Sequence, residues 1–266
     1  MYTIDLNCDL GESFGTYKIG MDEEIIPLIS SSNIACGFHA GDPNVMAKTI
    51  RMCKENNVAV GAHPGFYDLQ GFGRRNISIS PSDAKNIITY QMGALDAFCK
   101  QQGIIMQHVK PHGALYNMAA KDYLLAKAIC EGIFEYNKSL ILLGLAGSEM
   151  LKAAQDTGLI YASEFFADRA YEDDGTLVPR TNPRALIRDE DELINRIIST
   201  IKNHTVKSIN GKEIKIAPHS LCVHGDGEKA LLFVKRIKQT FENEHICIKP
   251  ISEVLYNSVG SSANFV

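Results

Sequence analysis

The chain of 266 residues contains no tryptophan and no apolar run long enough to cross a membrane. A membrane-spanning helix requires about 20 mostly apolar residues in a row. The formal net charge is only −4. A nearly balanced charge gives no general attraction for nucleic acid or for anionic membranes. We therefore expect neither nucleic acid nor a membrane as a partner.

Cysteine occurs seven times, but the positions are widely spaced and include no CxxC pair. An odd number at such spacing argues against a disulfide framework or a zinc knuckle, and it favours reduced thiols. The amino-terminal segment MYTIDLNCDLGES lacks the basic and apolar regions of a signal peptide. These features predict a cytoplasmic protein.

The signatures of several enzyme classes are also missing from the sequence. No GxGxxG follows the first predicted strand, and GxSxG, HExxH and GxxxxGK[ST] do not occur. These absences argue against a dinucleotide-binding fold, a serine-hydrolase elbow, a zinc-protease helix and a phosphate-binding loop, respectively.

Short apolar runs alternate with longer helix-like segments along the whole chain. Eight runs are predicted strands: 2–7, 33–38, 58–63, 106–111, 140–146, 159–166, 221–225 and 245–250. The clearest helical patterns between them are 42–56, 81–102, 119–136, 189–202 and 226–243. Strict alternation of this kind indicates an α/β protein with a parallel sheet covered by helices.

Polar and ionisable residues follow nearly every predicted strand. In chain order they are Asp9, Glu12, His39, His63, Lys110, His112, Asp168, Arg169, His224 and Asp226. In a closed barrel these strand ends converge on one mouth, where active sites are built. In an open sheet they would spread along an edge. We therefore predict a single-domain β/α barrel over residues 1–255, with a flexible tail at 256–266.

Two connecting segments have a character of their own. Residues 170–188 show no clear periodicity and contain two prolines, which is typical of a functional or lid-like loop. Residues 206–217 read as a hairpin that turns at Asn210–Gly211.

The stretch HVKPHG places His108, Lys110 and His112 two residues apart. Residues at this spacing on a strand share one face. His108 lies deeper in the strand, and we expect it to be packed and hydrogen-bonded, whereas Lys110 and His112 reach the mouth. A partly desolvated lysine has a lowered pKa and can exchange protons. The plainer alternative is a strand end that is merely polar.

The segment DLNCDLGE provides Asp9 and Glu12, and two further strand ends provide His39 and His63. Asp9, His39 and His63 would form a metal set of the carboxylate and imidazole kind. A hydrogen-bonded acid–base network uses the same groups, and the sequence does not distinguish the two. Asp42, which precedes a proline, is interpreted as a helix cap.

Several arginines could hold an anionic ligand, because a guanidinium binds carboxylate or phosphate in a bidentate manner. Arg74 lies in GFGRR, Arg169 follows the sixth predicted strand, and Arg180 lies in VPRTNPR. A solvated loop is the plainer reading of both arginine-bearing loops. His224 ends the strand in CVHGD, where Asp226 also reads as a helix cap.

Long motifs in a fixed order give the chain a resemblance to a known family. They are DLNCDLGES, NIACGFHAGDP, GAHPGF with GFGRR, VKPHGALYN, FADRAY, LVPR and VHGD, between residues 5 and 226. With these motifs the chain resembles the LamB/YcsF family. The resemblance implies a seven-stranded β/α barrel similar to that of polysaccharide deacetylases. It also implies the opening of the lactam of 5-oxo-L-proline (pyroglutamate) to L-glutamate, driven by ATP with Mg²⁺, together with two further subunits, B and C.

The resemblance and the strand ends together assign site residues. The catalytic set is Asp9, Glu12, His39, His63, Lys110 and His112. The substrate-binding set is Arg74, Arg169, Arg180, His224 and Asp226. In this hypothesis Asp9 or Glu12 is the base, His63 or His112 the acid, and Lys110 stabilises developing negative charge. Arg74 or Arg169 holds the substrate carboxylate.

Two other classes of function stay open at this point. The chain could be a stand-alone metal-dependent amidohydrolase or deacetylase on the same barrel, or a non-catalytic subunit that binds substrate or regulates. The missing phosphate-binding loop favours ATP chemistry supplied by a partner. A homo-oligomer is compatible with the sequence.

Overall fold

The computed structural model describes residues 2–223 and 228–262, with the side chains of 228–230 and 258–262 excepted. His224 and Asp226 lie outside the described residues.

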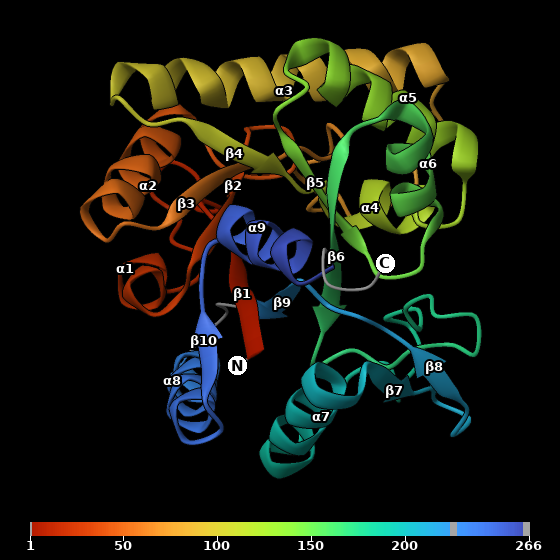
Figure 1. Ribbon diagram of the computed structural model, residues 1–266. Helices are drawn as coiled ribbons and strands as arrows, with labels where there is room; N and C mark the ends of the chain where they lie inside the picture. Colours follow the sequence, from red (N-terminus) through yellow and green to blue (C-terminus); the bar gives the residue numbers. More distant parts are fainter. Residues whose placement is uncertain (1, 224–227, 263–266) are drawn as a thin grey trace.

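Seven parallel strands close into a barrel (Figure 1). They are β1 (Tyr2–Leu10), β2 (Ser31–Ala35), β3 (Ala59–His63), β4 (Met106–Val109), β5 (Ile141–Leu145), β6 (Ile160–Phe166) and β9 (Ser220–Val223). Each pairs with the next, and β9 returns to pair with β1, with Asp5 opposite Ser220. Strand β10 (Ile246–Ile248) pairs with the first residues of β1. The predicted closed barrel is thereby confirmed.

Helices on the outside of the barrel connect these strands. They are α1 (Asp22–Ile25), α2 (Pro43–Glu55), α3 (Pro81–Gln101), α4 (Gly113–Ala119), α5 (Tyr123–Tyr136), α6 (Glu149–Thr157), α7 (Glu190–Asn203), α8 (Glu228–Asn243) and α9 (Ile251–Ser262), with a 3₁₀ turn at Ile26–Leu28. Asp42 caps α2 as predicted, because its carboxylate accepts hydrogen bonds from the backbone N–H groups of Asn44 and Val45.

The helix predicted over 119–136 is present as α5, but it begins four residues later than predicted. Helix α4 ends at Ala119, and α5 begins only at Tyr123. The carboxylate of Asp122 accepts hydrogen bonds from the backbone N–H groups of Leu124 and Leu125, which is the arrangement of a helix N-cap. A new helix start at this point explains why the apolar periodicity does not continue as one helix.

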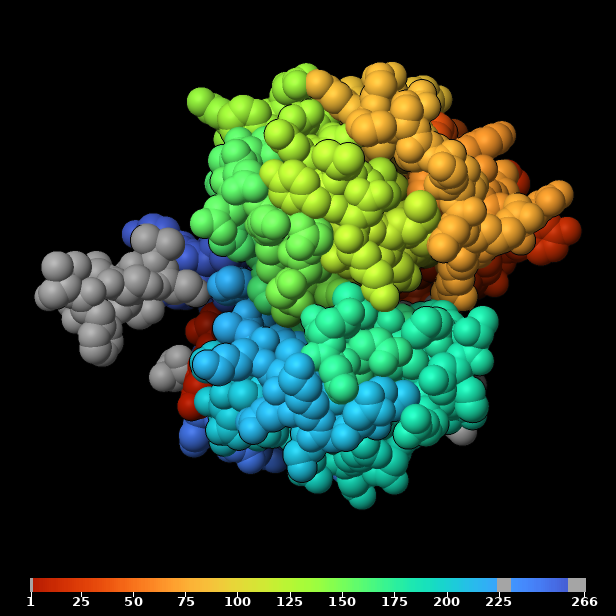
Figure 2. Space-filling view, turned by 90° about the vertical axis from the view of Figure 1, so that its right-hand side faces the viewer, coloured from red at the N-terminus to blue at the C-terminus, as the bar shows by residue number. Residues whose placement is uncertain are grey.

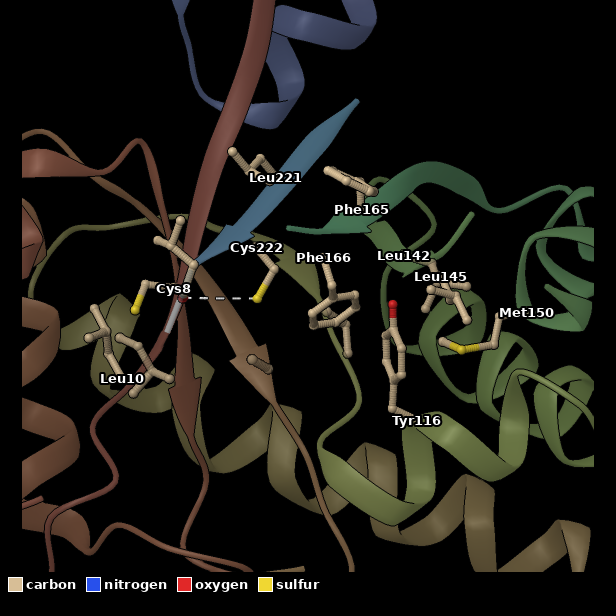
Figure 3. Close-up of a cluster of buried hydrophobic side chains, with 14 of the residues drawn as sticks. Cys8, Leu10, Tyr116, Leu142, Leu145, Met150, Phe165, Phe166, Leu221 and Cys222 are labelled. Atoms are coloured by element: carbon tan, nitrogen blue, oxygen red, sulfur yellow. Dashed lines mark hydrogen bonds between the residues drawn. The ribbon is translucent and has the colours of Figure 1, made fainter. Parts of the chain in front are cut away.

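The outer face of the strands is apolar and packs against the helices. On β1, Ile4, Leu6 and Cys8 are buried in the main hydrophobic cluster. Figure 3 shows the same cluster at β5 and α6, where Leu142 and Met150 lie close together. The alternate residues of the strands point into the barrel, so the polar side chains on them lie in its interior.

Helix α9 covers the amino-terminal end of the barrel. Its residues Ile251 and Leu255 pack against Ile141, Leu143 and Ala162, near the start of β5 and β6. Figure 1 shows α9 in front of the strands at this end. The domain boundary predicted at 255/256 falls inside this helix, which continues to Ser262. Residues 263–266 lie outside the described residues.

The hairpin predicted over 206–217 is present as β7 (Thr205–Lys207) and β8 (Glu213–Lys215), which pair in antiparallel fashion. Gly211 at its turn has a φ of 85°, in the left-handed region that glycine adopts readily. Among the described residues, the longest and most apolar helices still fall short of what a bilayer crossing requires.

A glycine on β3 makes room for a buried ring inside the barrel. A β-carbon at Gly61 would lie 2.2 Å from Nε2 of His108, which is hydrogen-bonded to Oδ1 of Asn33 at 2.8 Å. We expect Gly61→Ala to displace the ring and lower the free energy of unfolding by at least ~2 kcal/mol, as overpacked cores do.

The measurement is urea unfolding followed by circular dichroism. Gly93→Ala on α3 is the control, because a β-carbon there would meet no described atom within 4 Å. That control should raise stability by up to ~1 kcal/mol through helix propensity. Wild-type stability in Gly61→Ala would contradict the packing described here.

Candidate active site

Above the apolar layer that α9 covers, the barrel interior carries a column of hydrogen-bonded polar side chains, where such barrels usually have branched apolar side chains. At the bottom, the fully buried carboxylate of Asp5 accepts hydrogen bonds from the hydroxyls of Ser30 (2.7 Å), Ser31 (2.6 Å) and Ser220. One level higher, the amide of Asn7 donates to Oγ of Ser220 (2.7 Å) and to Oε1 of Glu164 (3.0 Å). The column thus connects the bottom of the barrel to its mouth.

Lys110 stands at the top of this column, just beyond β4, and is 2% exposed. Its Nζ lies 2.7 Å from Oε1 of Glu164 and 2.9 Å from Oδ1 of Asp9. Burial alone would lower the pKa of Lys110, but the charges of Asp9 and Glu164 outweigh it and raise that pKa well above its ordinary value. The expectation of a lowered pKa is therefore wrong, because two carboxylates hold the lysine as a permanent cation.

Glu164 is a site residue that the sequence interpretation missed. It lies on β6, is fully buried, and accepts a hydrogen bond from the hydroxyl of Tyr116 at 2.7 Å in addition to its ion pair with Lys110. The signal in the sequence is a charged residue on the same strand face as Ala162 and Phe166, in a mostly apolar run. Such a residue must face a partner inside the barrel.

Beside the lysine, four buried side chains from four different strand ends form a compact group. Glu12, His39, His63 and His112 each offer a nitrogen or oxygen atom, and these atoms lie within 4.8 Å of one another. The rings of His39 and His112 are stacked, with centroids 3.6 Å apart and planes inclined by 3°. We call these four residues the histidine cluster.

Backbone carbonyl groups orient two of the rings. Nδ1 of His63 donates to the carbonyl oxygen of Lys110 at 2.7 Å, and Nε2 of His112 donates to that of Phe72 at 2.8 Å. Burial, and next the neighbouring histidines, lower the pKa of His39 and bring that of His112 down to about 3. Both of these rings are therefore neutral near pH 7.

Asp9 does not belong to the histidine cluster, although the predicted metal set was Asp9, His39 and His63. Its Oδ1 accepts hydrogen bonds from Lys110 and from Asn33, the latter at 2.9 Å. Its Oδ2 lies 3.3 Å from Nε2 of His63. The structure brings Glu12 and His112 together with His39 and His63 instead, and Asp9 bridges this cluster to the lysine.

The lysine and the cluster face a cavity of about 970 Å³ at the carboxyl ends of the strands. Its lining includes Asp9, Glu12, His63, Lys110 and His112, together with Arg74, Arg169 and Arg180. In Figure 2 the teal segment that follows β6 lies against the gold and yellow-green segments that follow β3 and β4. All three segments supply residues to the lining of the cavity. The teal segment includes part of the predicted lid-like loop.

Arg169 and Arg180, which follow β6, make one wall of the cavity positive. Arg169 is 4% exposed, and one of its nitrogens donates to the carbonyl oxygen of Val178 at 2.8 Å. Its Nε is buried and has no hydrogen-bond partner among the described residues. Burial, and next the charge of Arg180, lower the pKa of Arg169 to about 10, so it remains a cation near neutral pH. Arg180 is exposed on the same wall.

The two adjacent arginines in GFGRR have different environments. Arg75 forms an ion pair with Asp68. The guanidinium of Arg74 lies over the ring of Phe72, 4.9 Å from its centroid. Because Arg75 is engaged by a carboxylate, Arg74 is the better placed of the two to meet an anionic ligand in the cavity.

A closed β/α barrel with a buried lysine–carboxylate pair and histidines at one cavity is the arrangement of a β/α-barrel enzyme. The LamB/YcsF family model matches residues 4–256, and the chain belongs to the LamB/YcsF family. The family resemblance inferred from the motifs is thereby confirmed.

Curated relatives and a solved structure agree with this assignment. The 5-oxoprolinase A subunit of Clostridium beijerinckii is 63% identical over 254 residues, which cover 96% of this chain and 100% of that protein. The 5-oxoprolinase A subunit of Pyrococcus abyssi is 51% identical over 252 residues, covering 95% and 99%. The crystal structure of a lactam utilization protein from Thermus thermophilus matches with a TM-score of 0.87 and 39% identity, over 93% of this chain and 99% of that one.

The carboxyl group at the bottom of the column should make stability depend on pH. Burial, opposed by the serine hydrogen bonds, raises the pKa of Asp5 from 3.8 to about 6. Between these pH values the folded protein keeps a proton that the unfolded chain has released, so stability falls as the pH rises through this window. At ~1.4 kcal/mol per pH unit, the loss amounts to ~3 kcal/mol. Asp5→Asn should remove this loss.

The measurement is the free energy of unfolding in urea at pH 4, 5, 6 and 7. The difference between Asp5→Asn and wild type should shift in favour of the variant as the pH rises. Asp189→Asn at the start of α7 is the control, because asparagine also caps a helix. A difference for Asp5→Asn that stays constant across the four pH values would show that Asp5 is not the source.

Proposed function

We propose that this chain is the A subunit of a 5-oxoprolinase, which opens the lactam of 5-oxo-L-proline to L-glutamate with hydrolysis of ATP. The observation that carries the proposal is the 63% identity to a 5-oxoprolinase A subunit over that protein's whole length. The cavity supports it, because a fixed ammonium group, carboxylates and imidazoles face arginines across a space that fits a small anionic substrate.

The chemistry of a lactam explains the need for ATP. Its amide is resonance-stabilised, so hydrolysis near neutral pH is slow. Transfer of the terminal phosphoryl group of ATP to the amide oxygen releases ADP and makes the carbonyl carbon electrophilic. A water molecule then adds to this carbon, and the ring nitrogen leaves with a proton. A second water molecule hydrolyses the resulting acyl phosphate to glutamate and phosphate.

The described residues suggest roles in these steps. Lys110 is suited to stabilise the charge on the phosphoryl or amide oxygen, because its own charge does not depend on pH in the neutral range. Asp9 is the base that we favour over Glu12, since its carboxylate is 20% exposed and borders the cavity. With no ion in the histidine cluster, His63 is the residue placed to protonate the leaving nitrogen, because His112 is neutral near pH 7.

Arg169 and Arg180 are proposed to hold the substrate carboxylate, with Arg74 opposite them. Arg169 is the firmest element, because its buried guanidinium is already fixed by Val178 and retains an unpartnered Nε among the described residues. The cavity of about 970 Å³ exceeds what 5-oxoproline needs. It therefore leaves room for phosphate groups beside the lactam.

Partner subunits and nucleotide are the finer part of the proposal. The relatives carry the name of one lettered subunit, which implies other subunits, and we propose that these are subunits B and C. ATP with Mg²⁺ would bind on a partner or between chains, since the sequence contains no phosphate-binding loop. We propose a cytoplasmic setting, where ATP is available and where the seven cysteines, all described as free thiols, stay reduced.

The direct test combines the purified chain with its two partner subunits, 5-oxoproline and Mg²⁺-ATP. We expect glutamate and ADP to form together in the full mixture. When the chain is omitted, both products should form more slowly than in the full mixture. Glutamate formed without ATP and partners would instead favour a stand-alone amidohydrolase. A full mixture with competent partners that yields no glutamate would refute the proposal.

Lys110→Met should abolish most of the activity of the assembled enzyme. The variant removes the cation that faces the reacting oxygen, so turnover should fall by at least ~10²-fold. It also leaves Asp9 and Glu164 without their partner, which costs about 3–5 kcal/mol of stability for a buried pair. Circular dichroism must therefore confirm that the variant is folded at the assay temperature.

The control is Lys100→Met on α3, where the side chain is 75% exposed and pairs with Asp96. It should retain wild-type turnover. A folded Lys110→Met that turns over like the wild type would remove the lysine from the mechanism.

A further inference from the structure

The rings of His63 and His112 approach each other through two nitrogens that both carry lone pairs, and such a contact requires a positive charge between them. Nδ1 of His63 and Nε2 of His112 each donate to a backbone carbonyl oxygen. A carbonyl group is only an acceptor, so both of these nitrogens carry hydrogen. In a neutral ring the other nitrogen then carries a lone pair. These two nitrogens, Nε2 of His63 and Nδ1 of His112, lie only 2.9 Å apart.

A carboxylate adds to this concentration of lone pairs. Oε1 of Glu12 lies 3.6 Å from Nδ1 of His112 and 3.3 Å from Nε2 of His39. Four potential ligand atoms therefore converge from four strand ends, and all four residues are buried. The lone pairs of His63 and His112 repel at 2.9 Å unless a positive charge lies between them.

We propose that Glu12, His39, His63 and His112 bind one divalent transition-metal ion of the zinc class. With metal–ligand bonds of about 2.0–2.2 Å, the ligand atoms of a tetrahedral zinc site lie about 3.3–3.6 Å apart. The separations from Glu12 to His39 and His112 are 3.3 and 3.6 Å, the two nitrogens of His63 and His112 are closer at 2.9 Å, and all four atoms lie within 4.8 Å, so small side-chain shifts would complete the site. Three imidazoles and one carboxylate suit zinc and its neighbours in the transition series, whereas Mg²⁺ and Ca²⁺ prefer oxygen ligands.

Backbone groups around the histidine cluster hold its rings in the orientation that metal ligands need. Metal-bound histidines usually donate their second nitrogen to a carbonyl or carboxylate, which fixes the orientation of the ring. The carbonyl groups of Lys110 and Phe72 do this for His63 and His112. Gly73 provides the space for the stacked pair, since a β-carbon there would lie 2.7 Å from Cβ of His39 and 2.8 Å from Cδ2 of His112.

The site opens to the substrate cavity, because Glu12, His63 and His112 belong to its lining. An ion in the cluster would occupy the lone pairs of both rings, so they would serve as ligands and not as the acid of the lactam reaction. The inference does not depend on the proposed function, since it rests on the hydrogen bonds and separations within the cluster.

A shared proton is the rival explanation for the close approach of the two nitrogens. In that case Nδ1 of His112 would donate to Nε2 of His63, and the resulting imidazolium would face Glu12. Metal content separates the two explanations, because a proton needs no ion.

The first experiment uses the full chain without an affinity tag. The protein is stripped with a chelator, incubated with Zn²⁺, passed through a desalting column and subjected to elemental analysis. We expect one equivalent of zinc per chain. Co²⁺ in place of Zn²⁺ should give the intense visible absorption of a tetrahedral site. Failure of the wild type to retain either ion would overturn the proposal without recourse to any variant.

The second experiment uses Glu12→Gln, which keeps the shape of the side chain but removes its charge. Changes in outer-shell partners weaken metal binding by about 10–100-fold, so loss of a direct ligand should weaken it by at least ~100-fold in calorimetry. His112→Ala should act in the same direction. The control is His204→Asn, at an exposed residue with a φ of 56°, a region that asparagine tolerates.

Thermal unfolding provides a readout that is independent of activity. Zn²⁺ should raise the melting temperature of the wild type and of His204→Asn, because the ion binds the folded state. It should raise that of Glu12→Gln much less, because the weaker site is less occupied at the same Zn²⁺ concentration. Equal stabilisation of Glu12→Gln and wild type would place the ion elsewhere and refute the assignment. Metal binding with no lactam turnover would leave this site standing and count against the proposed function alone.

Discussion

The structure depends on one buried interaction, the contact of the Lys110 ammonium group with the carboxylates of Asp9 and Glu164. Lys110 directly follows β4, Asp9 lies on β1 and Glu164 lies on β6, so the ion pairs run across the interior of the barrel and not along its wall. A buried charge without partners costs several kcal/mol. Each of the three charges is therefore tolerated only while the strands keep the other two within reach, and the position of the strand ends is fixed as a consequence.

The polar column beneath the lysine follows from the same constraint. Glu164 and Asp9 have more acceptor sites than the ammonium group can fill, and Asn7, Asn33 and Tyr116 donate to the remainder. Asn7 and Asn33 need partners in turn, and the network extends down to Asp5 and its serines. The hydrophobic contribution to stability then has to come from the outer face of the strands, where the helices bury the side chains that alternate with these polar ones.

Much of the architecture could be predicted from the sequence, because alternation of strands and helices and polar strand ends are local patterns. The start of α5 was placed four residues too early, since the apolar periodicity was followed without regard to the Asp122 cap. Glu164 was missed for a different reason. Alternation shows which face of a strand a residue occupies, but it does not show which residue lies opposite across a barrel. The pKa of Lys110 was predicted in the wrong direction for the same reason, because its sign is set by partners 101 and 54 positions away in the chain, at Asp9 and Glu164.

The mouth of the barrel contains a charged part around Lys110 and an uncharged part around the histidines, and Asp9 contacts both. In one part Lys110 is held permanently charged, and in the other the burial of His39 and His112 keeps those rings neutral near pH 7. Asp9 belongs to both, because Oδ1 contacts the lysine and Oδ2 lies 3.3 Å from Nε2 of His63. Any positive charge that enters the histidine cluster, whether a proton or an ion, competes with the lysine for this carboxylate. The two parts are thus coupled through Asp9, and its carboxylate sets how strongly a change in the cluster is felt at the ammonium group.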